Sequence, residues 1–273
     1  MLNDTSRATG KILTMATLDS IQRAAQEQFS RQSRRYGKGH ILENVEDVSE
    51  ALGFIRLPAH ARVLDVACGA GHTGLHLASL GHEVTCADVS AEMLDRTREN
   101  ALSKGLLIGT RQHTAESMPY EDGAFDLVTC RVAPHHFSSP SAFVRESARI
   151  LRSGGWLLLI DGTIPDSDPE AGEWLNRIEK LRDPSHVRLI APVEWCHYCS
   201  ESGLRVGHHW LRRKKQPDLE WYFETADTSP ENRREVLSMI ADAPTHIRDA
   251  FSLDHEDGKI VWQWPILSLL AQK

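Results

Sequence analysis

The sequence predicts an α/β fold, a Rossmann-like, mostly parallel sheet with helices on both faces, and two observations support it. From residue 62 onward, short apolar runs bounded by turn residues alternate with helical stretches, which is the pattern of βαβ units. Between the first such run and the first such helix lies DVACGAGHTG, residues 65–74. Its glycines are typical of a strand–loop–helix ligand site.

The elements follow from where apolar runs and turn signals alternate along the chain. Strands are predicted at 62–67, 83–88, part of 107–113, 125–131, 155–163, 204–215 and, after the turn EDG, 258–273. Helices are predicted at 71–80, 91–104, 141–151, 192–203 and 217–250, and the insertion at 164–190 is helical in its middle.

Helical periodicity also precedes the sheet, at 17–56. The first helix there has Thr17 or Asp19 as a capping residue. Further on, one helical face carries the apolar residues Val45, Val48, Leu52 and Ile55.

Composition and charge exclude several functions. The 273 residues are 41% hydrophobic and 25% charged, as in an ordinary globular protein. The net charge is −7 and the basic run LRRKK at 211–215 is short, so no nucleic-acid partner is expected. No stretch approaches the roughly 20 apolar residues of a membrane span, and the N-terminus lacks an apolar signal region. We therefore expect a cytoplasmic protein without a membrane span.

The cysteines do not indicate a metal site, and the tryptophans of the last strand are explained by packing. Five cysteines, mostly within apolar strand-like runs, indicate reduced thiols. Cys196 and Cys199 form a CxxC pair with His208 and His209 nearby, but a structural zinc site normally needs two such pairs. No metal is expected. Trp262 and Trp264 share one face of the last strand, where core packing or a homodimer contact explains them.

The glycine loop fits two ligands. Gly69, Gly71 and Gly74 spell G-x-G-x-x-G, and Asp88, at the end of the second strand, can hold both hydroxyls of a ribose. NAD and S-adenosylmethionine (AdoMet) both carry that ribose. Asp65 favours AdoMet, because a carboxylate there would face the phosphates of a dinucleotide, whereas AdoMet carries an amino group and a sulfonium that are cationic.

Four blocks along the chain resemble the class I AdoMet-dependent methyltransferases of the UbiE-like (type 11) group. They are VLDVACGAGHTGLHLA, CADVSAEML, HTAESMPYEDGAFDLVTCRVAPHHF and ARILRSGGWLLLIDGTIPD. The resemblance covers about residues 29–205 and implies a seven-stranded sheet with an antiparallel last strand. It also implies an N-terminal helical lid at 1–56 and a methyltransferase domain at 57–273 with a lid insertion at about 164–195.

The same resemblance implies the activity. The protein would transfer a methyl group from AdoMet to a small molecule, such as a secondary metabolite or a quinone-like compound, and leave S-adenosylhomocysteine. The acceptor atom, O, N, S or C, does not follow from the sequence. A dinucleotide-dependent oxidoreductase and a protein that binds AdoMet or S-adenosylhomocysteine without methylating are the alternatives.

Cofactor contacts are implied position by position. The motif places Asp65, Ala67, Gly69 and Gly71 around the methionine part of AdoMet. It places Asp88 on the ribose, and Val89 and Met93 beside the adenine. The family usually has Gly-Asp-Ala-Glu where this chain has residues 113–116, HTAE, so Thr114 replaces the acidic partner of the adenine amino group. Because a hydroxyl accepts that bond less strongly than a carboxylate, we expect weaker binding, or an adenine held mainly by the backbone at Ala115.

The reacting groups are expected where the fourth strand ends, since ligands lie beyond the carboxyl ends of strands in an open α/β sheet. Arg131, His135 and His136 follow that strand end. His136 or His135 is the candidate base, because a histidine titrates near neutral pH, and packing or loop capping is the alternative for each. Arg131, also placed at the cofactor, pairs either with an acidic substrate group or with an acidic residue of the chain.

Acceptor contacts are expected from two segments. The insertion carries IEKLRDPSHVR, which resembles a segment after the fifth strand in some bacterial members of the group, and offers Arg182 and His186. The segment FSRQSRRYGKGH offers Phe29 and Tyr36 as walls over the cofactor. Ion pairs on a solvated helix turn, and plain packing onto the sheet, are the respective alternatives.

Overall fold

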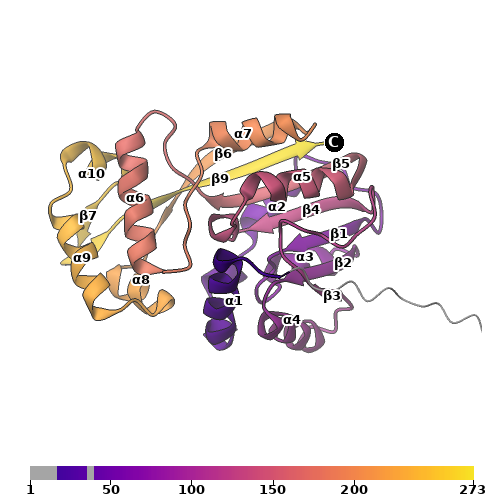
Figure 1. The fold of residues 1–273 in the computed structure, drawn as a ribbon, viewed down its shortest axis with the longest axis horizontal. Helices are drawn as coiled ribbons and strands as arrows, with labels where there is room; N and C mark the ends of the chain where they lie inside the picture. The colour runs from indigo at the N-terminus through magenta and orange to yellow at the C-terminus, as the bar shows by residue number, and fades with distance from the viewer. Residues whose placement is uncertain (1–16, 36–39) are drawn as a thin grey trace, which may run out of the picture.

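The structure, a computed structural model, describes residues 17–35 and 40–273. In this part of the chain, seven strands form one sheet in the order β3-β2-β1-β4-β5-β9-β6 (Figure 1). They are β1 (Arg62–Val66), β2 (Glu83–Asp88), β3 (Gly109–Gln112), β4 (Phe125–Arg131), β5 (Leu151–Gly162), β6 (Arg205–Lys215) and β9 (Gln263–Gln272). Strands β1 to β5 pair in parallel and β9 runs antiparallel between β5 and β6. The predicted fold class is therefore confirmed, including the reversed last strand.

Helices occupy most connections between the strands. Those of the sheet layers are α1 (Ser20–Gln32), α2 (Glu46–Leu52), α3 (His72–Ser79), α4 (Ala91–Ser103), α5 (Pro140–Ile150) and α7 (Pro192–Glu201). The others are α6 (Pro169–Arg182), α8 (Leu219–Ala226), α9 (Pro230–Ala241) and α10 (Thr245–Phe251). Short 3₁₀ helices are η1 (Ser33–Arg35), η2 (Ile41–Glu43) and η3 (Pro134–His136). No described helix is both long and apolar enough to cross a lipid bilayer.

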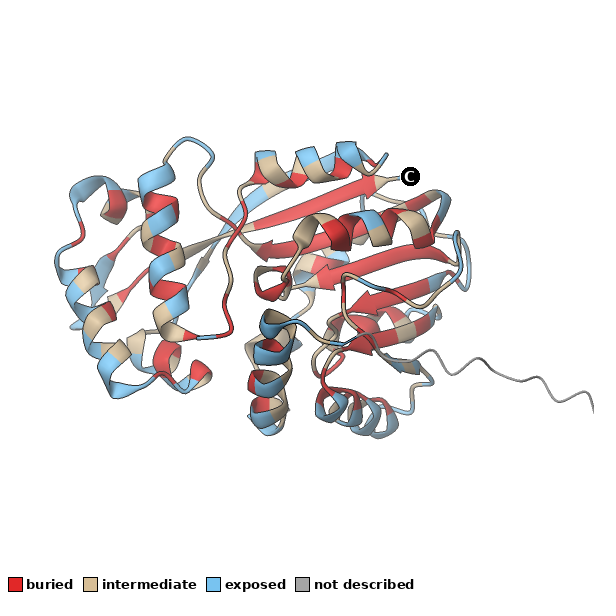
Figure 2. Ribbon diagram, in the orientation of Figure 1, coloured by how far each residue is buried: buried red, intermediate tan, exposed pale blue. Residues whose placement is uncertain are grey.

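Successive side chains of a strand point to opposite faces of the sheet, and along the central strands both sets are apolar because both faces are buried. Leu64 and Val128 pack in one core with α5 and α7, whereas Val63 and Leu127 pack in another with α2 and α3. Figure 2 shows the central strands as buried throughout most of their length. This packing holds the carboxyl ends of the strands, where the loops begin, in fixed positions.

Helix α1 lies across these carboxyl ends beside α4 (Figure 1). Asp19, one of the two predicted capping residues, is its N-cap and forms a capping box with Gln22. Along the helix, Gln26 Nε2 donates to the carbonyl of Val89 at 2.8 Å, and the Ser30 hydroxyl donates to Glu92 at 2.6 Å. These bonds fix α1 over the loop that follows β2.

A separate hydrophobic core, called the second core because it lies apart from the two faces of the sheet, is found at one end of the molecule. In Figure 1, α6, α8, α9 and α10 gather there around the far ends of β6 and β9. The aromatic side chains buried in this core are Tyr222, Phe223, Phe251 and Trp262. The part of the predicted insertion that joins it is α6, whereas α7 packs on the sheet. Most of the second core comes from residues 219–262, which the sequence pattern did not associate with the insertion.

The predicted last strand, 258–273, is two elements. Lys259–Val261 (β8) pairs with Asp254–Glu256 (β7) as a hairpin, and β9 begins at Gln263. The turn between β7 and β8 has φ values of 50° at Asp257 and 76° at Gly258, as two-residue hairpin turns require. The turn EDG thus closes a local hairpin rather than leading directly into the sheet.

Candidate functional site

A first cavity lies beyond the carboxyl ends of β1, β2 and β4, where the strand order reverses between β1 and β4. Many of the predicted cofactor residues line it: Ala67, Gly69, Asp88, Val89, Met93, Thr114, Ala115 and Arg131. Lining residues that the sequence analysis did not assign include Gln22, Ala25, His72, Thr73, His113 and Glu116.

Each glycine of the loop meets a different requirement. Gly69 has a φ of 54° and an added Cβ would meet no atom within 4 Å, so its backbone borders open space in the cavity wall. Gly71, which we expected at the cofactor, instead packs against α4, where a Cβ would lie 2.6 Å from Cγ2 of Thr97. At Gly74 a Cβ would clash with Sγ of Cys86, so this glycine lets α3 pack closely on β2.

Asp65 points into the protein and not into the cavity. Its Oδ2 accepts the N–H of Gly74 and its Oδ1 accepts the hydroxyl of Thr129, both at 2.9 Å. The residue is 1% exposed, and burial raises its pKa to about 7. The expectation that Asp65 faces the ligand is therefore wrong, because the buried carboxylate binds the first turn of α3 through one oxygen and β4 through the other.

Asp88 is a carboxylate that does line the first cavity. Its Oδ2 accepts the N–H of Gly69 and its Oδ1 accepts the N–H of Ser90, both at 2.9 Å. Burial raises the pKa of Asp88 to about 6, which leaves it mostly ionised at pH 7. Together with Glu116 it gives the wall a negative character that favours a cationic ligand over a pyrophosphate.

Glu116 supplies a carboxylate two residues after Thr114. It accepts the N–H of Ser138 at 3.0 Å and Nε2 of Gln22 at 2.9 Å. It thereby connects α1 with the loop after β3. The sequence analysis gave no role to Glu116 or Gln22, since no local pattern relates two residues that are 94 positions apart.

Arg131 binds the segment that precedes the sheet. Its Nε donates to Asp47 at 2.9 Å, and its two terminal nitrogens donate to the carbonyls of Leu42 at 2.9 Å and Asn44 at 2.6 Å. The side chain is 6% exposed. Of the two roles considered for Arg131, the structure therefore supports the ion pair within the chain. A catalytic contact with an acidic substrate group is not supported, because the side chain is largely buried and three of its five N–H groups already donate within the chain.

A second cavity adjoins the first, and Phe29, Leu42, Val132 and His136 line both. Its apolar wall comes from α6, α8, β9 and neighbouring loops and includes Ile41, Leu175, Leu189, Trp221, Trp264, Pro265 and Ile266. Its polar wall includes Gln32, His40, His135, Glu179, Arg182, Asp183, His186, Lys214 and Thr225. The second cavity is thus enclosed between the sheet and the second hydrophobic core.

His135 and His136, the candidate bases, have different surroundings. Nδ1 of His135 lies 2.7 Å from Oδ1 of Asp161, and the His135 N–H donates to Oδ2 of the same carboxylate at 3.0 Å. Burial opposes a charged His135, but the Asp161 carboxylate outweighs it and raises the pKa of His135. Burial and the neighbouring His135 lower the pKa of His136. His135 therefore favours the cation, and His136 the neutral imidazole that can accept a proton.

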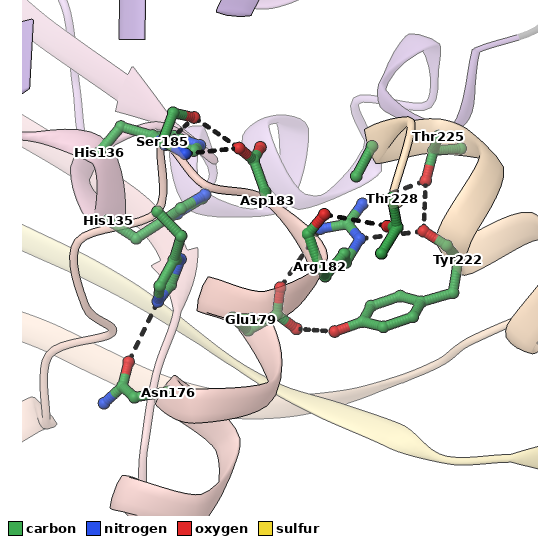
Figure 3. Close-up of polar contacts among 12 residues, drawn as sticks. His135, His136, Asn176, Glu179, Arg182, Asp183, Ser185, Tyr222, Thr225 and Thr228 are labelled. Carbon is green, nitrogen blue, oxygen red and sulfur yellow. Dashed lines mark hydrogen bonds and ion pairs between the residues drawn. The ribbon is translucent and has the colours of Figure 1, made fainter. Parts of the chain in front are cut away.

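Arg182 and His186 also lie in the wall of the second cavity. Arg182 donates to the carbonyl of Tyr222 at 3.0 Å and to Thr225 at 3.1 Å (Figure 3), and it lies over the Tyr222 ring. Nε2 of His186 lies 3.2 Å from Oδ1 of Asn176, and burial lowers the pKa of His186. Both residues therefore help to pack α6 in addition to lining the cavity.

The boundary between the cavities combines an aromatic contact with a strained backbone. The Phe29 ring meets the His136 ring edge-on, with 4.8 Å between centroids. Val132 has a φ of 54°, which is rare for a β-branched residue and is found most often at functional sites. Tyr36, the other predicted wall residue, lies outside the described residues.

Within residues 17–35 and 40–273, no group of three or more His, Cys, Asp or Glu side chains has an arrangement that could hold a metal ion. Cys196 and Cys199 of the CxxC pair lie on α7, where Cys199 is buried against the sheet. Packing therefore accounts for their spacing on the helix.

Comparisons with known proteins agree with this geometry. A family model described as a methyltransferase domain matches residues 64–159. The uncharacterized methyltransferase YcgJ of Bacillus subtilis is 32% identical over 227 residues, which are 82% of this chain and 88% of YcgJ. The crystal structure of YcgJ covers 84% of this chain with a TM-score of 0.78.

Two further similarities concern a solved structure and a curated sequence. A putative methyltransferase from Bacillus halodurans, 30% identical, covers 84% of this chain and 99% of its own with a TM-score of 0.79. A ubiquinone biosynthesis O-methyltransferase of Xanthomonas axonopodis pv. citri is 39% identical over 157 residues, 55% of this chain and 64% of its own.

Proposed function

Since the chain belongs to the class I AdoMet-dependent methyltransferases of the UbiE-like (type 11) group, we propose that it methylates a small molecule held in the second cavity. The observation that carries this proposal is the wall shared by the two cavities at Phe29, Val132 and His136. A ligand beside the glycine loop and a second ligand among α6, α8 and β9 meet at these residues.

The residues of the first cavity fit AdoMet. An added Cβ at Gly69 would project into free space, so the backbone there can approach a ligand closely. Nε2 of His72, in the same wall, is buried without a hydrogen-bond partner among the described residues, and a ligand can satisfy it. The carboxylates of Asp88 and Glu116 suit the cationic groups of AdoMet.

The roles proposed for the residues of this cavity are those that the family resemblance implies. Ala67 and Gly69 border the methionine part, and Asp88 binds the ribose hydroxyls. Val89 and Met93 flank the adenine, with Thr114 and Ala115 at its edge.

The second cavity fits an acceptor with an apolar body and one polar end. Trp221, Trp264 and Leu189 offer apolar area, and His135, His136 and Lys214 lie among the polar wall residues. A quinone-like compound or an aromatic secondary metabolite has this character. The similarity to a ubiquinone biosynthesis O-methyltransferase supports the same substrate class.

The chain's own residues orient the ligands and exclude water. Gln22 and Gln26 hold α1 over the first cavity through Glu116 and the Val89 carbonyl, which shields the reacting groups from solvent. Bound there, AdoMet supplies a methyl group on a sulfonium, an already activated leaving group, so positioning accounts for most of the catalysis.

The binding step is tested by calorimetry with AdoMet and with NADH. We expect AdoMet and not NADH to bind, and Asp88→Ala to weaken AdoMet binding at least tenfold, or about 1.4 kcal/mol. Asp95→Ala is the matched control, because Asp95 is an exposed carboxylate on α4 that pairs with Arg98. Binding of NADH, or unchanged affinity of the Asp88 variant, would contradict the proposal.

Methyl transfer itself is tested by incubating the protein with AdoMet and a panel of aromatic and quinol compounds. The expected product besides the methylated compound is S-adenosylhomocysteine. Tight AdoMet binding without any S-adenosylhomocysteine formation would favour the non-methylating alternative.

A further inference from the structure

Three buried side chains form a hydrogen-bonded row that ends at His136 (Figure 3). Asp183 is the C-cap of α6 and Ser185 follows two residues later. The Ser185 hydroxyl lies 2.7 Å from Oδ1 of Asp183 and 3.1 Å from Nδ1 of His136. These three residues are 7%, 5% and 8% exposed, so bulk water does not compete strongly for their hydrogen bonds.

The direction of each hydrogen bond follows from the number of protons available. A carboxylate only accepts, and Oδ1 of Asp183 accepts both the N–H and the hydroxyl of Ser185. A serine hydroxyl has one hydrogen, which is therefore used toward Asp183. Nδ1 of His136 must then carry the proton that is donated to Ser185. The neutral ring consequently has its lone pair on Nε2, which has no hydrogen bond to any described residue.

The neighbours of His136 keep its ring neutral. The groups that face it are His135 on η3, Arg182 and Asp183 at the end of α6, and His186 on the loop beyond. Burial and His135 lower the pKa of His136, and the Asp183 carboxylate opposes them. A base of this kind is weak, and it suits a hydroxyl of phenolic acidity better than that of an alkyl alcohol.

We propose that Asp183 and Ser185 are positioning residues that hold His136 as the Nδ1–H tautomer, so that Nε2 takes the proton of a phenol-type acceptor hydroxyl. This inference rests on the proposed function and names its substrate class: the product is an aryl methyl ether. His136 lines both cavities, so the proton acceptor is at the place where the two ligands meet.

The reaction balances without any other reagent. The acceptor proton moves to Nε2 of His136, while Nδ1 keeps its proton and its bond to Ser185. The acceptor oxygen bonds to the methyl carbon, and the electron pair of the broken carbon–sulfur bond stays on sulfur as S-adenosylhomocysteine forms. The resulting imidazolium is stabilised by Asp183 through Ser185 and releases its proton to solvent when the products leave.

The tautomer is measured on the protein alone by nitrogen-15 NMR of the histidine rings, with His136→Gln used to assign the signal. We expect the wild type to show protonated Nδ1 and bare Nε2 at His136. Ser185→Ala should shift the ring toward a mixture of tautomers, and Ser185→Thr should restore the wild-type pattern. A wild-type ring protonated on Nε2 overturns the inference, whether or not the protein methylates anything.

The matched control is Ser147→Ala, which also removes a buried hydroxyl, but on α5 and outside both cavities. It should leave the His136 signal unchanged. If the His136 signal changed equally in the Ser147 and Ser185 variants, the change would reflect a general effect of losing a buried hydroxyl. The row of hydrogen bonds would then not set the tautomer.

Kinetics test the substrate class with phenols of graded acidity, from 4-methylphenol to 4-nitrophenol, and with aniline. We expect ether formation from the phenols. Ser185→Ala should lower kcat about 10- to 100-fold for 4-methylphenol and less for 4-nitrophenol, with little change in KM. Methylation of aniline but of no phenol overturns the acceptor class. AdoMet binding, measured separately by calorimetry, decides the proposed function independently.

Discussion

At the residue scale, the two carboxylates at the ends of neighbouring strands face opposite ways. Asp65, in the penultimate position of β1, turns inward and accepts hydrogen bonds from Gly74 and Thr129. Asp88, the last residue of β2, lines the first cavity. The charge that favours a cationic ligand therefore comes from Asp88 and Glu116, and Asp65 contributes by shaping the loop.

The buried Asp65 makes stability depend on pH. Its pKa is raised to about 7 in the folded protein by burial, against about 3.9 in an unfolded chain. The folded state thus binds the proton more tightly, and this favourable contribution is lost as pH rises through about 7. In Asp65→Asn this loss should disappear. Between pH 5 and 8 the unfolding free energy of the wild type should fall relative to the variant by on the order of 2 kcal/mol.

Chemical denaturation of both proteins at several pH values measures this difference. If the unfolding free energies of the wild type and Asp65→Asn changed with pH in parallel, the Asp65 carboxyl would titrate alike in the folded and unfolded states. That result would contradict the prediction.

Arg131 gives a prediction that separates a structural role from a catalytic one. Arg131→Met removes the donors to Asp47 and to the carbonyls of Leu42 and Asn44. Because the side chain is buried, we expect the unfolding free energy to fall by about 2–4 kcal/mol. Arg98→Met, which removes an exposed pair with Asp95, should change it by less than about 0.5 kcal/mol. Equal stability of the two variants would contradict the structural role and favour a ligand-binding role for Arg131.

At the element scale, the site depends on how closely α3 and α4 approach the glycine loop. Gly71 and Gly74 leave space for Thr97 and Cys86, so that the start of α3 lies directly over the sheet. Helix α1, held by Gln22 and Gln26, contributes a further part of the cavity wall. The cavity wall is thus made by element packing as much as by ligand-contacting side chains.

Gly74→Ala tests this packing. A methyl group there would overlap Sγ of Cys86, so α3 must shift away from β2. We expect the unfolding free energy to fall by about 1–3 kcal/mol. AdoMet binding should also weaken, although Gly74 itself does not line the cavity. Gly53→Ala is the milder control, because φ is −64° there and an added Cβ would lie 3.1 Å from the Glu50 carbonyl oxygen instead of overlapping a neighbour; it should change both quantities less. If Gly74→Ala matched that control in denaturation and calorimetry, the close packing would not be required.

At the scale of the whole molecule, three hydrophobic cores surround the two cavities. The cores on the two faces of the sheet fix the glycine loop, whereas the second core, with Tyr222 and Trp262, lies behind the far wall of the second cavity. Strands β6 and β9 extend from one region into the other (Figure 1). We therefore expect the regions around the two cavities to respond to ligands separately.

Hydrogen exchange measured by mass spectrometry checks this separation. Saturating AdoMet should slow exchange in α1 and in residues 40–47, since Gln22, Ala25, Phe29 and Leu42 line the first cavity. Helices α9 and α10 contribute no residue to that wall and should exchange as before. Protection that is equal in α1 and α9, or absent from α1, would show that α1 does not cover the cofactor.

Sequence by itself determined the parts of this protein that depend on neighbours along the chain. The alternation of strands and helices, the strand–loop–helix around Gly69 and the position of Asp88 all follow from local patterns, and they predicted the fold and most of the first cavity. Thr114 and Ala115 also line this cavity, and their contact with the cofactor stays a prediction.

Only the tertiary structure decided which distant side chains meet. Arg131 binds Asp47, 84 residues away, and His136 meets Ser185, 49 residues away, so neither the ion pair nor the tautomer follows from a local pattern. The inward turn of Asp65 likewise depends on Thr129 of the adjacent strand. The second core joins α6 to residues 219–262 because burial of apolar area is non-directional and selects partners by shape in space, not by order in the chain.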